Sequence, residues 1–195
     1  SGGADDPATT TPALITIDAG APPAGRPSYA RRSLTKALLR CVALAAYTPG
    51  TGDAGRDGAE AAELHACLAA IFRRAGDFGG ALFALAASVM ADLIHHDPLC
   101  FPALEAAAVP EAFVDAVKAG VPPAGEALCC LPPALGALCL NSSGLARVRD
   151  AGALESVATV LTGPAYLRAL QGDTPSVVGA GLDELMRHVP ALRPD

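Results

Sequence analysis

The fold is decided by residues 79–120, which read GGALFALAASVMADLIHHDPLCFPALEAAAVPEAFVDAVKAG. Residues 80–96 are apolar on nearly every side, and a helix without a wide polar face has to lie between other helices. Asp97 is a residue type that caps helix N-termini, and Pro98 after it suits the first helical position, so a short helix is expected next. Val109-Pro110 opens a third helix, which Gly120 ends. The stretch therefore predicts a long, a short and a second long helix.

A similar unit returns about 44 residues later as GEALCCLPPALGALCLNSSGLARVRDAGALESVATVLTG and ends at Gly163. Here Asn141 or Ser142 is expected to cap the short helix, Gly152 to form the tight turn, and Pro132-Pro133 to kink or split the long helix. A third long helix is expected after Thr174-Pro175, and its end, ELMRHVP, repeats the DLIHHDP of residues 92–98.

Units of this length with one short and two longer helices are typical of armadillo-type repeats, which cover one another's apolar faces. The predicted fold class is all-α, an armadillo-like right-handed α-solenoid of about three to four stacked helical repeats. We expect a disordered or loosely ordered leader at 1–28 and helical repeats at 29–195, with a flexible loop at about 48–60.

The first helix is predicted to run from about residue 29 to 47. Its apolar stripe, expected to face inward, is formed by Leu34, Leu38, Cys41 and Ala45. A basic stripe of Arg32, Lys36 and Arg40 is predicted to be a solvated face, with an acidic partner as the alternative.

Composition excludes several function classes. The chain is 51% hydrophobic and 17% charged, so we expect one end of the stack to be covered by further repeats of the same chain or by a protein partner. The net charge of −6 argues against specific binding of nucleic acid or of an anionic membrane surface. No unbroken apolar run is long enough to span a membrane, and the pattern of the first residues does not predict a signal peptide.

The six cysteines form no CxxC pair and indicate reduced, buried thiols in an intracellular protein of the cytoplasm or nucleus. His95, His96 and Cys100 lie close together in sequence but lack a second ligand pair, so no metal site is expected. Nothing in the sequence indicates a cofactor, because no phosphate-binding glycine motif is present.

Two acid–histidine pairs, Asp92 with His96 and Glu184 with His188, have the i,i+4 spacing that brings side chains to one helix face. They indicate either an acid–base dyad, a partner-binding surface, or histidines held at helix C-termini by the dipole. Their recurrence in two repeats favours the helix-end interpretation. The candidate partner-binding surface consists of Arg32, Lys36, Arg40, Asp92, His96, Glu184 and His188, and no catalytic residue is predicted.

Several motifs carry a family resemblance, in the order KALLRC, IFRRAGDFGGALFALAASVMADLIHHDPLCFPALEAA, EALCCLPPALGALCLNSSGL and YLRALQGDTPSVVGAGLDELMRHVPALR. Between Ser33 and Arg193 the chain resembles the N-terminal armadillo-like region of giant HECT-type ubiquitin ligases, of the plant UPL type and the animal Mule type. Residues 134–161 also resemble a single armadillo repeat. Asp92, Ala137 and Glu184 then stand where nuclear-import armadillo proteins carry groove asparagines, which puts an asparagine ladder in doubt.

The resemblance implies a solenoid that recruits substrates, while a C-terminal HECT module transfers ubiquitin through a thioester cysteine. None of the six cysteines matches that position. The leading hypothesis is thus a non-catalytic, substrate-recruiting scaffold segment of a HECT-type E3 ligase. An armadillo-type adaptor unrelated to ubiquitin is the alternative, and a small helical enzyme using the acid–histidine pairs ranks third.

Overall fold

The computed structural model describes residues 27–46 and 59–193. The predicted leader at 1–28 and the loop at about 48–60 lie almost entirely outside these ranges and stay predictions. Within them the regular elements are all helices, with no strand, so the predicted all-α fold class is confirmed.

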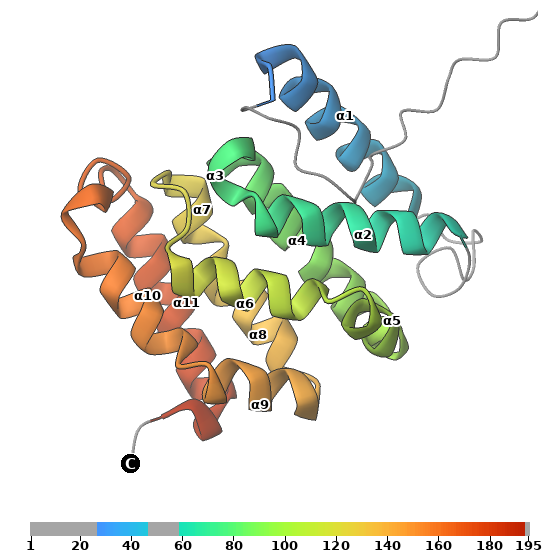
Figure 1. Ribbon diagram of the computed structural model, residues 1–195. Helices are drawn as coiled ribbons and strands as arrows, with labels where there is room; N and C mark the ends of the chain where they lie inside the picture. The colour runs from blue at the N-terminus through green and yellow to red at the C-terminus, as the bar shows by residue number, and fades with distance from the viewer. Residues whose placement is uncertain (1–26, 47–58, 194–195) are drawn as a thin grey trace, which may run out of the picture.

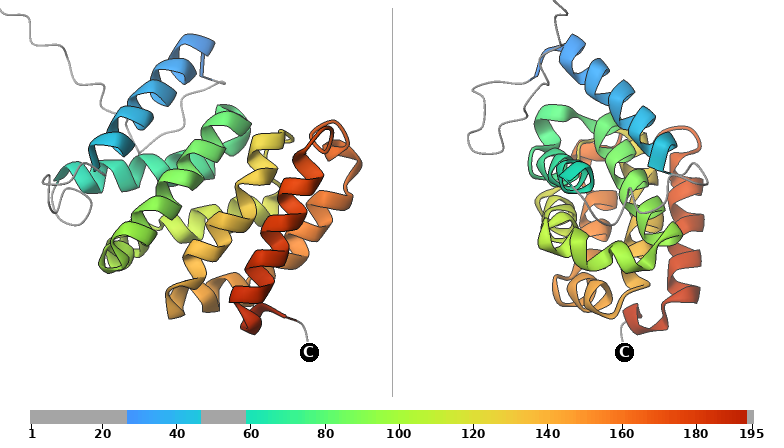
Figure 2. Two further views of the ribbon diagram at one scale, coloured as in Figure 1. Left: turned by 180° about the vertical axis from the view of Figure 1, so that it is seen from behind. Right: turned by 90° about the vertical axis from the view of Figure 1, so that its right-hand side faces the viewer.

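The helices stack in two layers (Figure 1). One layer, seen side by side in the left view of Figure 2, contains α1 (Tyr29–Ala46), α4 (Gly80–His96), α7 (Gly125–Cys129) with α8 (Leu131–Cys139), and α11 (Thr174–His188). The other layer contains α2 (Ala59–Arg73), α6 (Val109–Ala119) and α10 (Ala153–Thr162). The short helices between them are α3 (Ala75–Phe78), α5 (Phe101–Ala106) and α9 (Ser142–Asp150), with 3-10 turns at Pro98–Cys100, Pro164–Tyr166 and Pro190–Leu192.

Three phenylalanines join the two layers at the centre of the core. Phe72 of α2 meets Phe83 of α4 edge-on at 5.5 Å between ring centroids and Phe113 of α6 at 5.2 Å, and the last two stack at 5.9 Å. All three are completely or almost completely buried. Aromatic pairs in such geometries add about 0.5–1.5 kcal/mol each beyond the burial of their surface. This cluster fixes α4 against α2 and α6.

The predicted repetition is visible in atomic detail. Asp97 Oδ1 accepts a hydrogen bond from the N–H of Leu99 at 3.0 Å, and Asn141 Oδ1 accepts one from the N–H of Ser143 at 3.0 Å. The turn before each following long helix is left-handed, at Ala108 (φ +56°) and at Gly152 (φ +62°). Each pair of equivalent positions is 44 residues apart, as predicted for the repeat.

The break expected at the paired prolines is present, since α7 ends at Cys129 and α8 begins at Leu131. Asp77 and Thr174 are residue types that often cap helices and stand just before long helices, but neither acts as an N-cap here. Asp77 belongs to α3 and forms an ion pair with Arg74 at 2.9 Å, so it does not cap α4. Thr174 is already helical, and the capping position of α11 is occupied by Asp173. The side chain of Thr174 lies against Gly125 of α7, since a Cβ added to Gly125 would be 2.9 Å from Thr174 Oγ1.

The orientation predicted for α1 is also wrong. Among the described side chains of α1, Leu39 is buried, whereas Leu34, Leu38 and Cys41 are exposed. The side chain of Ala45 lies outside the described residues. The helix is apolar on two faces, so periodicity alone did not decide which face meets α4. The basic stripe is consequently turned toward the stack: Arg32 and Lys36 are half-buried and Arg40 is exposed.

Candidate partner-binding groove

A groove of about 570 Å³ runs over the outer face of α4. Its α4 residues follow the spacing of one helix face and are mostly small: Ala81, Ala84, Leu85, Ala87, Ser88, Ala91, Asp92 and His95. One wall is α1, which contributes Lys36 and Arg40. The other wall is formed by α7 and α8 through Glu126, Cys129, Cys130, Pro133 and Ala134. The groove is therefore a trough with a small-residue floor, flanked by α1 on one side and by α7 and α8 on the other.

The positive and negative side chains of the groove lie on different helices. The cations Lys36 and Arg40 come from α1, while Glu126 comes from the opposite wall and Asp92 from the floor. None of these four side chains forms an ion pair within residues 27–46 and 59–193. Their charges are available to a ligand of complementary pattern.

The histidines at the helix ends bond to the backbone of their own helices. In each case Nδ1 lies close to the carbonyl oxygen four residues earlier. The distance is 2.7 Å from His95 to Ala91, 2.9 Å from His96 to Asp92, and 2.9 Å from His188 to Glu184. A carbonyl oxygen only accepts, so Nδ1 carries the proton and donates it. His96 and His188 are both exposed, and neither lines the groove over α4. This geometry favours the helix-end interpretation over an acid–base dyad.

The structure brings together three of the seven predicted surface residues. Lys36, Arg40 and Asp92 line the groove, while Arg32 and His96 lie on the same two helices without lining it. Glu184 and His188 lie on α11, beyond α8. The comparison with groove asparagines does not hold for Ala137, which is completely buried and presents no side chain to a ligand.

The partner-binding surface predicted from sequence did not include His95, Glu126 or the small-residue floor. The signal for the floor was present, because alanine and serine recur at positions 81, 84, 88 and 91, one face of the helix. The role of Glu126 could not be found this way, since its position opposite α1 depends on how α7 packs against α4.

All six cysteines are free thiols, and burial makes several of them less acidic. Burial raises the pKa of Cys100 to about 11, of Cys130 to about 12 and of Cys139 to about 11. A thiol with a raised pKa is less often the reactive thiolate at neutral pH. In the part of the chain that the structure describes, no group of three or more metal-ligating side chains gathers.

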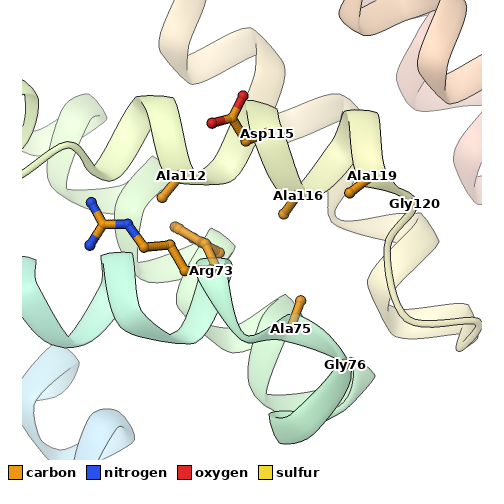
Figure 3. A pocket seen from close by; sticks show the side chains of 9 residues that line it. Arg73, Ala75, Gly76, Ala112, Asp115, Ala116, Ala119 and Gly120 are labelled. Atoms are coloured by element: carbon orange, nitrogen blue, oxygen red, sulfur yellow. The ribbon is translucent and has the colours of Figure 1, made fainter. Parts of the chain in front are cut away.

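A second, smaller hollow of about 310 Å³ lies on the other layer, between the end of α2, α3 and α6 (Figure 3). Its walls are mainly small residues, with Arg73 and Asp115 at different places on the rim. These two exposed side chains form no ion pair with each other.

Across the described helices, none is long and apolar enough to cross a bilayer.

A family model described as Domain of Unknown Function (DUF913) matches residues 23–195. The chain belongs to this DUF913 family. The DUF913 chain is 52% identical over 166 residues to E3 ubiquitin-protein ligase UPL1 of Arabidopsis thaliana, covering 85% of this chain and 4% of that protein. It is 32% identical over 174 residues to E3 ubiquitin-protein ligase HUWE1 of Mus musculus, covering 85% of this chain and 4% of that protein. It is 31% identical over 117 residues to E3 ubiquitin-protein ligase TOM1 of Saccharomyces cerevisiae, with 60% and 4% covered.

The predicted resemblance to ubiquitin ligases is therefore confirmed. The chain spans about 4% of the length of these curated relatives.

Proposed function

We propose that this chain is a non-catalytic, substrate-recruiting scaffold segment of a HECT-type E3 ubiquitin ligase in the cytoplasm or nucleus. The observation that carries the proposal is the 52% identity to an E3 ubiquitin-protein ligase over 85% of the chain, in a match that covers only 4% of that ligase. A segment of that size leaves room elsewhere for the catalytic module.

The site geometry is compatible with recruitment. The groove over α4 has a small-residue floor that allows close approach and charges of both signs that a protein ligand of complementary charge can match. The raised pKa values of Cys100, Cys130 and Cys139 disfavour a thioester-forming role for these thiols.

We also propose that further repeats of the parent chain cover the outer face of α1. Leu34, Leu38 and Val42 recur every four residues along this face and are 48%, 52% and 42% exposed. Together they form a stripe of at most a few hundred Å², well below the roughly 800 Å² per partner of a standard stable interface. A covalently linked neighbouring repeat fits such a stripe better than a second molecule, because stacking within one chain has no association cost.

The proposal is tested in cells by deleting residues 59–193 from the parent ligase and comparing ubiquitin-remnant peptides by mass spectrometry. We expect a defined set of ubiquitinated proteins to decline, while the parent still forms a ubiquitin thioester. Loss of the thioester would show that the segment supports catalysis itself. A parent transcript that encodes no HECT module would instead favour an adaptor unrelated to ubiquitin.

A further inference from the structure

We infer that the groove over α4 binds a single amphipathic helix of a protein partner, with acidic side chains along one edge of that helix and basic side chains along the other. The floor, the length and the charge distribution of the groove each point to this occupant.

The floor selects a helix over an extended peptide. An extended peptide presents an N–H and a C=O at every residue, and these groups need hydrogen-bonding side chains when they are desolvated. Among the groove-lining residues of α4 from Ala81 to Ala91, Ser88 is the one with a polar side chain. A helix satisfies its backbone internally and requires only that the facing side chains be small, as they are at Ala84 and Ala91.

The length suits about four helical turns. The floor extends from Ala81 to His95 along a continuous helix, which corresponds to about 21 Å at 1.5 Å per residue. A partner helix of this length places an anchor in the groove at every turn, in the i, i+4, i+7, i+11 pattern of helix-in-groove recognition. The volume of about 570 Å³ holds the inward-facing side chains of such a helix while its outer face stays in solvent.

The charges set the pattern on the partner. Lys36 and Arg40 are four residues apart on α1, so both face the groove one turn apart and match two acidic residues at i,i+4 on the near edge of a bound helix. Glu126 on the opposite wall and Asp92 in the floor match basic residues on the other side. A helix with one sign of charge on both edges meets repulsion from one wall whichever way it runs.

Such a helix would be the element recruited by the proposed ligase segment. Its part in ubiquitination therefore rests on the proposed function, whereas its binding to the groove does not. A binding measurement without ubiquitin separates the two.

The test uses fluorescein-labelled, lactam-bridged helical peptides of about 18 residues, roughly 27 Å long, titrated with this chain by fluorescence anisotropy. All share one Ala/Leu face. One version has an acidic and a basic edge, one has two acidic edges, one has two basic edges, and one has a central proline that breaks the helix. We expect the two-signed helix to bind at least about tenfold more tightly than each of the others.

Variants of the chain then locate the binding. Lys36→Glu with Arg40→Glu should weaken the two-signed helix about tenfold and strengthen the helix with two basic edges. Ser88→Trp should block the floor, whereas Ala158→Trp, at an exposed position of α10, should leave binding unchanged. Because all these positions except half-buried Lys36 are exposed, and because the peptide series uses the unaltered chain, loss of folding would not imitate the result.

Three outcomes would overturn the inference. Equal binding of all the helical peptides would show that the charges on the helix edges do not determine binding. Equal binding of the proline-broken peptide would make the occupant extended. Absence of binding up to about 1 mM, where contacts worth only about 4 kcal/mol would register, would show that the groove is not a helix site.

Discussion

Replacing Gly144 by alanine tests how closely α9 packs on α8. A Cβ on this residue of α9 would lie 2.2 Å from the carbonyl oxygen of Leu138 in α8 and 2.9 Å from Cζ of Phe101. The first neighbour is backbone and cannot swing aside, so α9 must move away from α8 by about 1 Å to regain normal contact. Such overpacking costs about 1–3 kcal/mol or more, against a gain of about 1 kcal/mol in helix propensity. We expect a net loss of up to about 2 kcal/mol.

The assay is urea unfolding followed by far-ultraviolet circular dichroism, with the free energy of unfolding extrapolated to water. Gly179→Ala is the matched control, because it lies in α11 with nothing within 4 Å of the added Cβ. That substitution should stabilise the chain by about 0.5–1 kcal/mol through helix propensity alone. Equal effects of the two substitutions would refute the close packing of α9 on α8.

Ala108→Gly should raise the free energy of unfolding by about 1 kcal/mol, since it relieves a left-handed conformation at a non-glycine residue, and Gly152→Ala at the equivalent turn should lower it similarly; urea unfolding of both checks the repeat. Burial lowers the pKa of His65 below 6.5, so the unfolded chain binds more protons than the folded chain, and stability should fall as the pH drops below about 6.5. Thermal melting from pH 7 to 5 measures this dependence, which should be weaker in the His65→Leu variant. Leu39→Ala should lower the free energy of unfolding by about 2–3 kcal/mol because Leu39 is buried, whereas Leu38→Gln should change the melting curve little because Leu38 is exposed. A larger loss for Leu38→Gln would support the inward stripe that was predicted from sequence.

Sequence pattern was sufficient for the repeat and for most helix boundaries. Asp97 and Asn141 announce their short helices because a capping carboxylate or amide acts on the next few residues, a local effect that spacing captures. The face that α1 turns inward was mispredicted because that helix is apolar on two sides, at Leu34 and Leu38 and again at Leu39. Only the shape of α4 beneath it decides between them, and that is a tertiary property.

The candidate site divides in the same way. Lys36, Arg40 and Asp92 were identified as a possible partner surface because charges at helical spacing are visible in sequence. Their meeting with Glu126 was not predictable, since it joins α1, α4 and α7 across long sequence separations. The recurrence of the histidines in two repeats suggested that they are helix-end residues. The backbone hydrogen bonds of His96 and His188 agree with that interpretation.

The most direct test of recruitment without catalysis is a pair of substitutions in the parent ligase, Ser88→Trp in the groove and Ala158→Trp outside it. Two quantities are measured for each purified variant and in cells: the rate of ubiquitin thioester formation and the yield of ubiquitin-remnant peptides from other proteins. We predict equal thioester formation, with remnant peptides from a subset of proteins reduced only by Ser88→Trp. Identical remnant profiles for the two variants, or a thioester defect in the groove variant, would contradict the account.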